Sequence, residues 1–230
     1  MDFVKKLNPE LRKRLEQLVA TFVEETNWEG RGGLEVTDEM KVTVAGQACR
    51  LILALDEEQF RWVRTIYLFP STYAVAEMVP DEGGAHEESR SHRHGEAWMR
   101  GPVVLSWNAT LQGINNPDDG KNVVYHEFAH KLDMLDGFAD GTPELKGDVA
   151  YEAWARIVGS EYRELVEDAE RGKKTLLSKY GATNTAEFFA VATEEFFERP
   201  ERLSESHEQL YWCLCRFYNQ DTARNRVRMR

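Results

Sequence analysis

Apolar residues recur every three or four positions in several stretches of the chain, which is the spacing of a helix with one buried face. The clearest stretch is residues 8–26, where leucine, valine and phenylalanine follow this spacing. A second helix is predicted from Thr37 or Asp38, either of which can cap its start, through about Leu55. The same periodicity predicts later helices at residues 149–170, 185–198 and 205–219.

Two segments between these helices are rich in aromatic and β-branched residues, which favour strands. They are residues 67–75 and 103–107. Because the strands come first and most helices after them, the order predicts an α+β domain rather than alternating βαβ units. Between the two strands, residues 79–98 are polar and contain glycine and three histidines, His86, His92 and His94. We expect a mobile surface loop here; a second metal site is the alternative, although the spacing is not that of a recognised site.

Composition narrows the function classes. The chain has 230 residues, 42% of them hydrophobic, and a net charge of −11, which argues against nucleic acid as the main partner despite four arginines in the last seven residues. No segment approaches the 18 apolar residues of a membrane span, and the first residues lack the apolar core of a secretion signal. With three cysteines, too few for a disulfide framework, the chain is expected to be cytoplasmic.

The candidate chemistry lies in residues 126–130, which read His-Glu-Phe-Ala-His. His126 and His130 are four residues apart, so on a helix both imidazoles can reach one metal ion, and Glu127 lies about 100° round from His126. Apolar residues at helical spacing accompany the motif, Asp118 or Asp119 can cap the helix, and Gly137 can close it. This is the layout of a zinc hydrolase; a pair of core histidines is the alternative.

A catalytic zinc takes three protein ligands, so the third must come from elsewhere. Asp136 is predicted to point away, and Asp133 to be an outer hydrogen-bond acceptor. The remaining candidates are Glu152, Glu187 and the exposed-looking Glu194 and Glu195. Glu187 is favoured because it starts a helix that must be buried almost all round, although Asn184 and Glu187 also form a capping-box-like pair.

HEFAHKLD followed by KYGATNTAEFFAV and EEFF resembles the Mlc titration factor A family of bacterial zinc peptidases. The YGxxNxAEFFA segment is similar to the protease domain of anthrax lethal factor, and the shared features extend from about Tyr67 to RFYNQD near the end. The resemblance implies a zincin-like metallopeptidase domain, mostly helical with a small mixed sheet. One such domain is expected over residues 1–230, with a helical part at 1–65 and the catalytic core at 66–230.

The resemblance also implies the roles at the site. His126, His130 and Glu187 would bind Zn²⁺, Glu127 would be the general base, and Tyr180 would stabilise the oxyanion. The implied activity is that of a gluzincin-like peptidase, with an aminopeptidase type left open, acting on a peptide or protein. We expect the peptide to lie along residues 103–107 as an edge strand. The alternative is a regulatory protein that sequesters a transcription regulator, as the family name implies.

Overall fold

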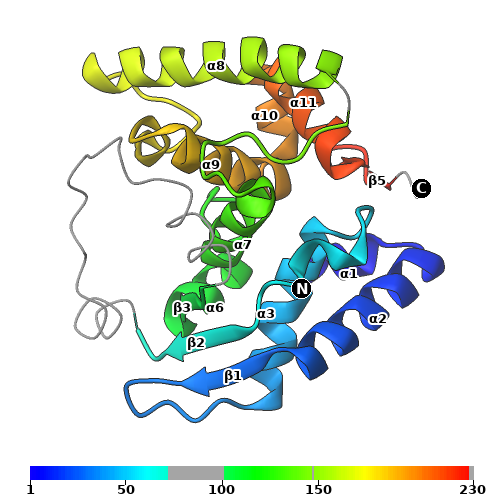
Figure 1. The fold of residues 1–230 in the computed structure, drawn as a ribbon. Helices are drawn as coiled ribbons and strands as arrows, with labels where there is room; N and C mark the ends of the chain where they lie inside the picture. The colour runs from blue at the N-terminus through cyan, green and yellow to red at the C-terminus, as the bar shows by residue number, and fades with distance from the viewer. Residues whose placement is uncertain (72–100, 147, 228–230) are drawn as a thin grey trace.

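The computed structural model describes residues 1–71, 101–146 and 148–227. Its first half is built around a three-stranded parallel sheet in the order β1-β2-β3 (Figure 1). The strands are β1 (Asn27–Gly30), β2 (Thr65–Phe69) and β3 (Val103–Ser106). Ile66, Leu68 and Leu105 are fully buried, so the sheet forms part of the core.

Helices lie before and between these strands along the chain. They are α1 (Asp2–Lys6), α2 (Pro9–Glu25), α3 (Asp38–Leu51) and the 3₁₀ turn η1 (Glu57–Phe60). Of these, α2 packs against α3. Side chains cap the two longer helices: Asn8 accepts from the Leu11 amide and Thr37 from the Met40 amide. Both caps satisfy amides that lack a partner inside the helix, which fixes where each helix begins.

The second half of the chain is almost entirely helical. Its elements are α6 (Trp107–Asn115), α7 (Val123–Asp133), η2 (Met134–Asp136), α8 (Asp148–Glu170), η3 (Lys179–Ala182), α9 (Thr185–Glu198), α10 (Pro200–Ser206), α11 (Glu208–Tyr218), β4 (Gln220–Asp221) and β5 (Arg226–Val227). The last two strands pair antiparallel in a separate ribbon. Figure 1 shows α7 between the sheet-containing half and α9, with α8 across the opposite end.

The position of α7 depends on its apolar face. Val124, Phe128 and Leu132 are fully buried, and the Phe128 ring lies 4.9 Å from that of Phe60 and 5.7 Å from that of Phe22. Rings packed edge to face bury apolar surface and also prefer a defined orientation relative to each other. It holds one side of α7 against α2 and η1 and leaves the histidine-bearing side facing α9.

The α+β fold class is confirmed, and so are the helices predicted at 8–26, 149–170 and 185–198. Other boundaries differ. The helix expected to reach Leu55 ends at Leu51, and the one expected at 205–219 begins at Glu208, after a separate α10. The four residues of β1 have no alternating pattern and were not predicted; with α3 and β2 they make one βαβ unit, contrary to the expected order.

The two predicted strands are shorter than expected. The first ends at Phe69, directly before Pro70, whose ring nitrogen has no hydrogen to donate to a ladder. The second ends at Ser106, whose hydroxyl caps α6, so Trp107 is helical. The expected loop at 79–98, with its histidines, lies outside the described residues. No helix in the described part of the chain is long and apolar enough to cross a membrane.

Candidate metal centre

Helix α7 begins at a buried side-chain cap. The Asn122 side-chain oxygen accepts from the backbone amides of Val124 and Tyr125, both at 3.1 Å. The predicted caps Asp118 and Asp119 are therefore wrong: they lie before Gly120, whose left-handed φ of 74° belongs to the turn that leads into the helix. At the other end, Gly137 has a left-handed φ of 96° and caps the C-terminus of η2, where the helical segment ends, as predicted.

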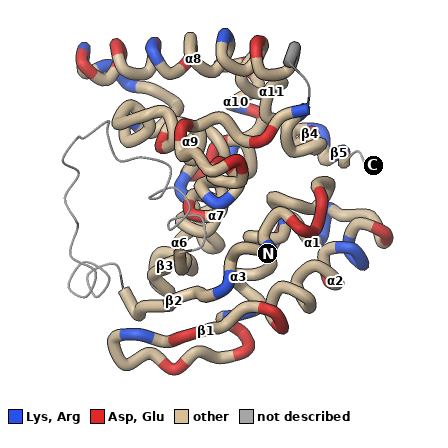
Figure 2. Tube along the Cα trace, viewed as in Figure 1, with Lys and Arg blue, Asp and Glu red and all other residues tan. Residues whose placement is uncertain are grey.

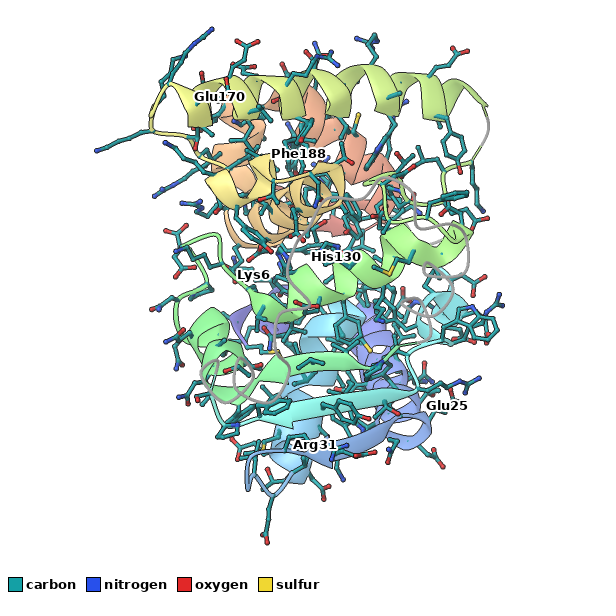
Figure 3. The ribbon with its side chains drawn as sticks, turned by 60° about the vertical axis from the view of Figure 1, so that its left-hand side comes forward. Lys6, Glu25, Arg31, His130, Glu170 and Phe188 are labelled. Atoms are coloured by element: carbon teal, nitrogen blue, oxygen red, sulfur yellow. The ribbon has the colours of Figure 1, made fainter. Side chains whose placement is uncertain are left out.

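Helix α9 supplies the opposite wall of the site. Asn184 caps it by accepting from the Glu187 amide at 2.9 Å, so the cap proposed from the sequence is present. From Phe188 onward every side chain of α9 is buried. Figure 3 shows α7, with His130 labelled, next to α9, with Phe188 labelled. Acidic side chains on α9 therefore face protein rather than water.

Three side chains from these two helices bring one ligand atom each to a common point. The Nε2 atoms of His126 and His130 are 3.3 Å apart. An oxygen of Glu187 lies 3.0 Å from the first and 3.5 Å from the second. His126, His130 and Glu187 thus form a group that can hold a metal ion.

The size of this triangle fits a tetrahedral metal site. Zinc lies about 2.0–2.2 Å from nitrogen and oxygen ligands, which in a tetrahedron puts neighbouring ligands about 3.4 Å apart. The three observed separations of 3.0, 3.3 and 3.5 Å bracket that value. Two imidazoles and a carboxylate also leave a fourth position for water or substrate.

The charge states suit a cation. Burial acts to raise the pKa of Glu187, but its contacts with His126 and His130 outweigh this and lower it to about 2, so the carboxylate is ionised. Burial acts to lower the pKa of His126, but its contacts with Glu187 and Glu194 outweigh this and raise the pKa to about 10. Without a metal, the negative charges around His126 therefore hold a proton that a metal ion would replace.

Glu194 supports His126 from the other side of its ring. Its Oε1 lies 2.7 Å from His126 Nδ1, and its Oε2 accepts from the Asn122 amide at 2.5 Å. A carboxylate behind a metal-binding histidine fixes the ring orientation and increases its basicity. The prediction that Glu194 is exposed is wrong, since the residue is 8% exposed.

This contact extends into a buried polar network. The Asn122 side-chain amide donates to Gln47 at 2.8 Å and to Glu198 at 3.0 Å. Burial raises the pKa of Glu198 to about 8. The network connects α3, the start of α7 and the end of α9 through satisfied hydrogen bonds, which makes the placement of His126 depend on all three helices.

The other two predicted site residues lie beside the triangle. Burial raises the pKa of Glu127, while the nearby His126 and His130 act to lower it. Tyr180 lies in η3, which Ser178 caps, and its ring centre is 5.8 Å from that of His126. The residue is 56% exposed.

The remaining candidates do not reach this point. Glu152 is exposed on α8, and Glu195, predicted to be exposed, is buried and paired with Arg199. Asp136 is exposed, with one oxygen accepting from the Phe138 amide. Asp133 is fully buried and accepts from the Gly141 amide at 3.0 Å rather than from a ligand histidine; its other oxygen and His130 Nδ1 have no hydrogen-bond partner among the described residues.

Comparison with known proteins agrees with this geometry. Residues 1–219 match the glucose-regulated metallo-peptidase M90 family. The chain belongs to this family. It is 37% identical over 219 residues to an uncharacterized protein of Synechocystis sp., a match that covers 95% of this chain and 80% of that protein.

Two further relatives carry the name Mlc titration factor A. The protein of Klebsiella pneumoniae is 30% identical over 219 residues, covering 94% of this chain and 81% of the relative. That of Yersinia pestis is 30% identical over 221 residues, covering 94% and 80%. The family resemblance seen in the motifs is confirmed over nearly the whole M90 chain.

The contact between Glu194 and His126 predicts a role in metal binding. Replacing Glu194 with Gln removes the negative charge behind the imidazole, so we expect metal affinity to fall about 10- to 100-fold. Competition with a chelator measures it. Glu205→Gln, an exposed glutamate on α10, is the matched control, and an unchanged affinity in Glu194→Gln would show that the contact does not support the site.

Proposed function

We propose that this M90-family chain is a zinc-dependent peptidase. The observation that carries the proposal is the triangle of His126, His130 and Glu187 ligand atoms, whose edges of 3.0 to 3.5 Å suit a tetrahedral ion. Zinc is favoured because imidazole and carboxylate ligands with one open position are typical of catalytic zinc sites. When bound, zinc supplies a Lewis acid that lowers the pKa of water to about 7 and polarises a carbonyl oxygen.

Glu127 is the proposed general base. It follows His126 on α7, which places its carboxyl beside the triangle. Burial raises its pKa, so it is a stronger base than an exposed glutamate. Glu127 would accept a proton from the attacking water and then donate it to the departing amine, which makes one residue sufficient for both transfers.

Tyr180 is the proposed donor to the oxyanion that develops on the substrate carbonyl. Its ring centre lies 5.8 Å from that of His126, one of the proposed metal ligands. Because the residue is 56% exposed, we expect substrate to reach its side chain. Such a donor acts only as charge develops, so it accelerates the chemical step more than it strengthens substrate binding.

Strand β3 is the proposed place for the peptide. It lies at one edge of the described sheet, and the Lys131 ammonium of α7 donates to the Gly101 carbonyl at 2.9 Å just before the strand begins. This bond ties the edge of the sheet to the helix that carries the histidines. A peptide added there would run past the site with its backbone paired.

Three free cysteines, two of them buried, support a reducing, cytoplasmic setting for the protein.

Two substitutions test the chemistry. Glu127→Gln is expected to abolish hydrolysis and keep the metal, and Tyr180→Phe to lower kcat about 100-fold with KM little changed. Peptide-library digestion by the zinc-loaded protein measures both, and peptides with free and blocked N-termini separate aminopeptidase from endopeptidase action. His126→Ala, which should lose metal and activity together, is the positive control for loss. Full activity in Glu127→Gln would rule out this mechanism.

A second function is supported by the relatives named Mlc titration factor A. We propose that this chain also binds a transcription regulator. The two functions are compatible, since a regulator can bind without being cleaved. Calorimetry with the regulator encoded in the same genome that most resembles Mlc tests it: binding of equal strength by wild type and Glu127→Gln is expected, and no binding by either would exclude it.

A further inference from the structure

Arg50, near the end of α3, lies among three aromatic rings. Its guanidinium carbon is 4.4 Å from the centre of the Phe3 ring, 5.1 Å from that of Phe197 and 5.7 Å from that of Tyr125. One Nη donates to the Tyr125 hydroxyl at 2.8 Å. Aromatic faces attract a cation, so these rings hold the guanidinium in place.

The same guanidinium has no acidic partner in the described part of the chain. Two other arginines, Arg199 and Arg224, are paired with Glu195 and Asp221. A guanidinium has five N–H donors, and one of those of Arg50 is used by a protein acceptor among the described residues. A half-buried cation with unused donors is costly unless an anion or water satisfies them.

Arg50 also lines a cavity of about 530 Å³, which is within the range of small-molecule sites. The cavity lies between α1, the start of α2 and the ribbon β4–β5, and none of the metal-site residues lines it. Its charged lining consists of Lys6, Arg50, Arg226 and Asp221. Figure 3 labels Lys6, which comes from α1.

The charge of this cavity is opposite to that of the protein. Asp221, its one acidic lining residue, already accepts from the Tyr211 hydroxyl at 2.6 Å and from Arg224 at 3.1 Å. Lys6 and Arg226 are exposed and have no ion-pair partner among the described residues. Three cations and one acid that is already paired therefore line this cavity, in a chain of net charge −11 whose acidic residues are spread along it (Figure 2). An adjoining cavity of about 550 Å³, which Arg50 and Lys6 also line, contains Tyr125, Phe197 and the acidic residues of that region.

We propose that this cavity binds a small molecule through a carboxylate or phosphate group. The oxyanion would accept from the fork of Arg50, which matches the paired oxygens of either group. Lys6 and Arg226 would contact it from the rim, and Leu7, Leu11 and Leu53 would pack against its apolar part. Because Arg50 donates to Tyr125, the residue before His126, the ligand lies one hydrogen bond from the helix that carries the metal ligands.

Titration calorimetry with the full chain at constant ionic strength tests the proposal. The probes are inorganic phosphate and succinate. We expect at least one of them to bind one per chain and to saturate below about 10 mM; the tighter probe identifies the group. Arg50→Met should weaken binding at least tenfold, and Lys13→Met, an exposed lysine on α2, should leave it unchanged.

Two further variants keep the test decisive if Arg50→Met does not fold. Lys6→Met and Arg226→Met change exposed side chains, and each should weaken binding severalfold. Arg50→Lys keeps the charge but loses the fork, so it should bind weakly while unfolding at a similar temperature. Absence of saturable binding by both probes, or binding that none of these variants weakens, would overturn the proposal.

Discussion

Each ring nitrogen of His126 lies against a glutamate of α9, and the rest of the site depends on this double contact. Nε2 is 3.0 Å from Glu187, and Nδ1 is 2.7 Å from Glu194. The two glutamates are seven residues apart, which on a helix puts them on one face about 10 Å apart along the axis. One imidazole fits between them. The contact fixes both the rotation of α9 and its distance from α7, and so decides where Glu187 meets His130.

The burial of α9 explains why these contacts form. An ionised carboxylate removed from water is unfavourable unless it is paired. Every glutamate of this helix has found a partner: Glu187 and Glu194 at His126, Glu195 at Arg199, and Glu198 at Asn122. The fold therefore gains a specific arrangement from groups that would otherwise oppose it. The same arrangement leaves one carboxylate, that of Glu187, in position to bind a metal.

The sequence predicted the elements that carry the site because both are long and periodic. The five-residue motif and its apolar stripe predicted α7, and the Asn184 cap predicted the start of α9. Glu187 was one of several open choices until the family resemblance was considered, because spacing along one helix does not say which other helix it meets. The geometry now brings it to the histidines.

What the sequence missed depends on contacts between distant segments. Asn122 was overlooked as a cap because two aspartates precede it, and its value comes from its buried contacts with Gln47 and Glu198. Glu194 was taken as exposed, although its place in a helix of phenylalanine, alanine and valine and its seven-residue spacing from Glu187 pointed to burial on the same face. Strand β1 has no periodicity to detect and exists because β2 pairs with it.

The central claim is that Glu187 and the two histidines bind one zinc ion. Anomalous diffraction at the zinc edge from a crystal of the zinc-loaded protein tests it most directly. We predict a single peak about 2.0–2.2 Å from Nε2 of His126, Nε2 of His130 and an oxygen of Glu187. A peak that Glu187 does not contact, or no peak between the histidines, would contradict the account.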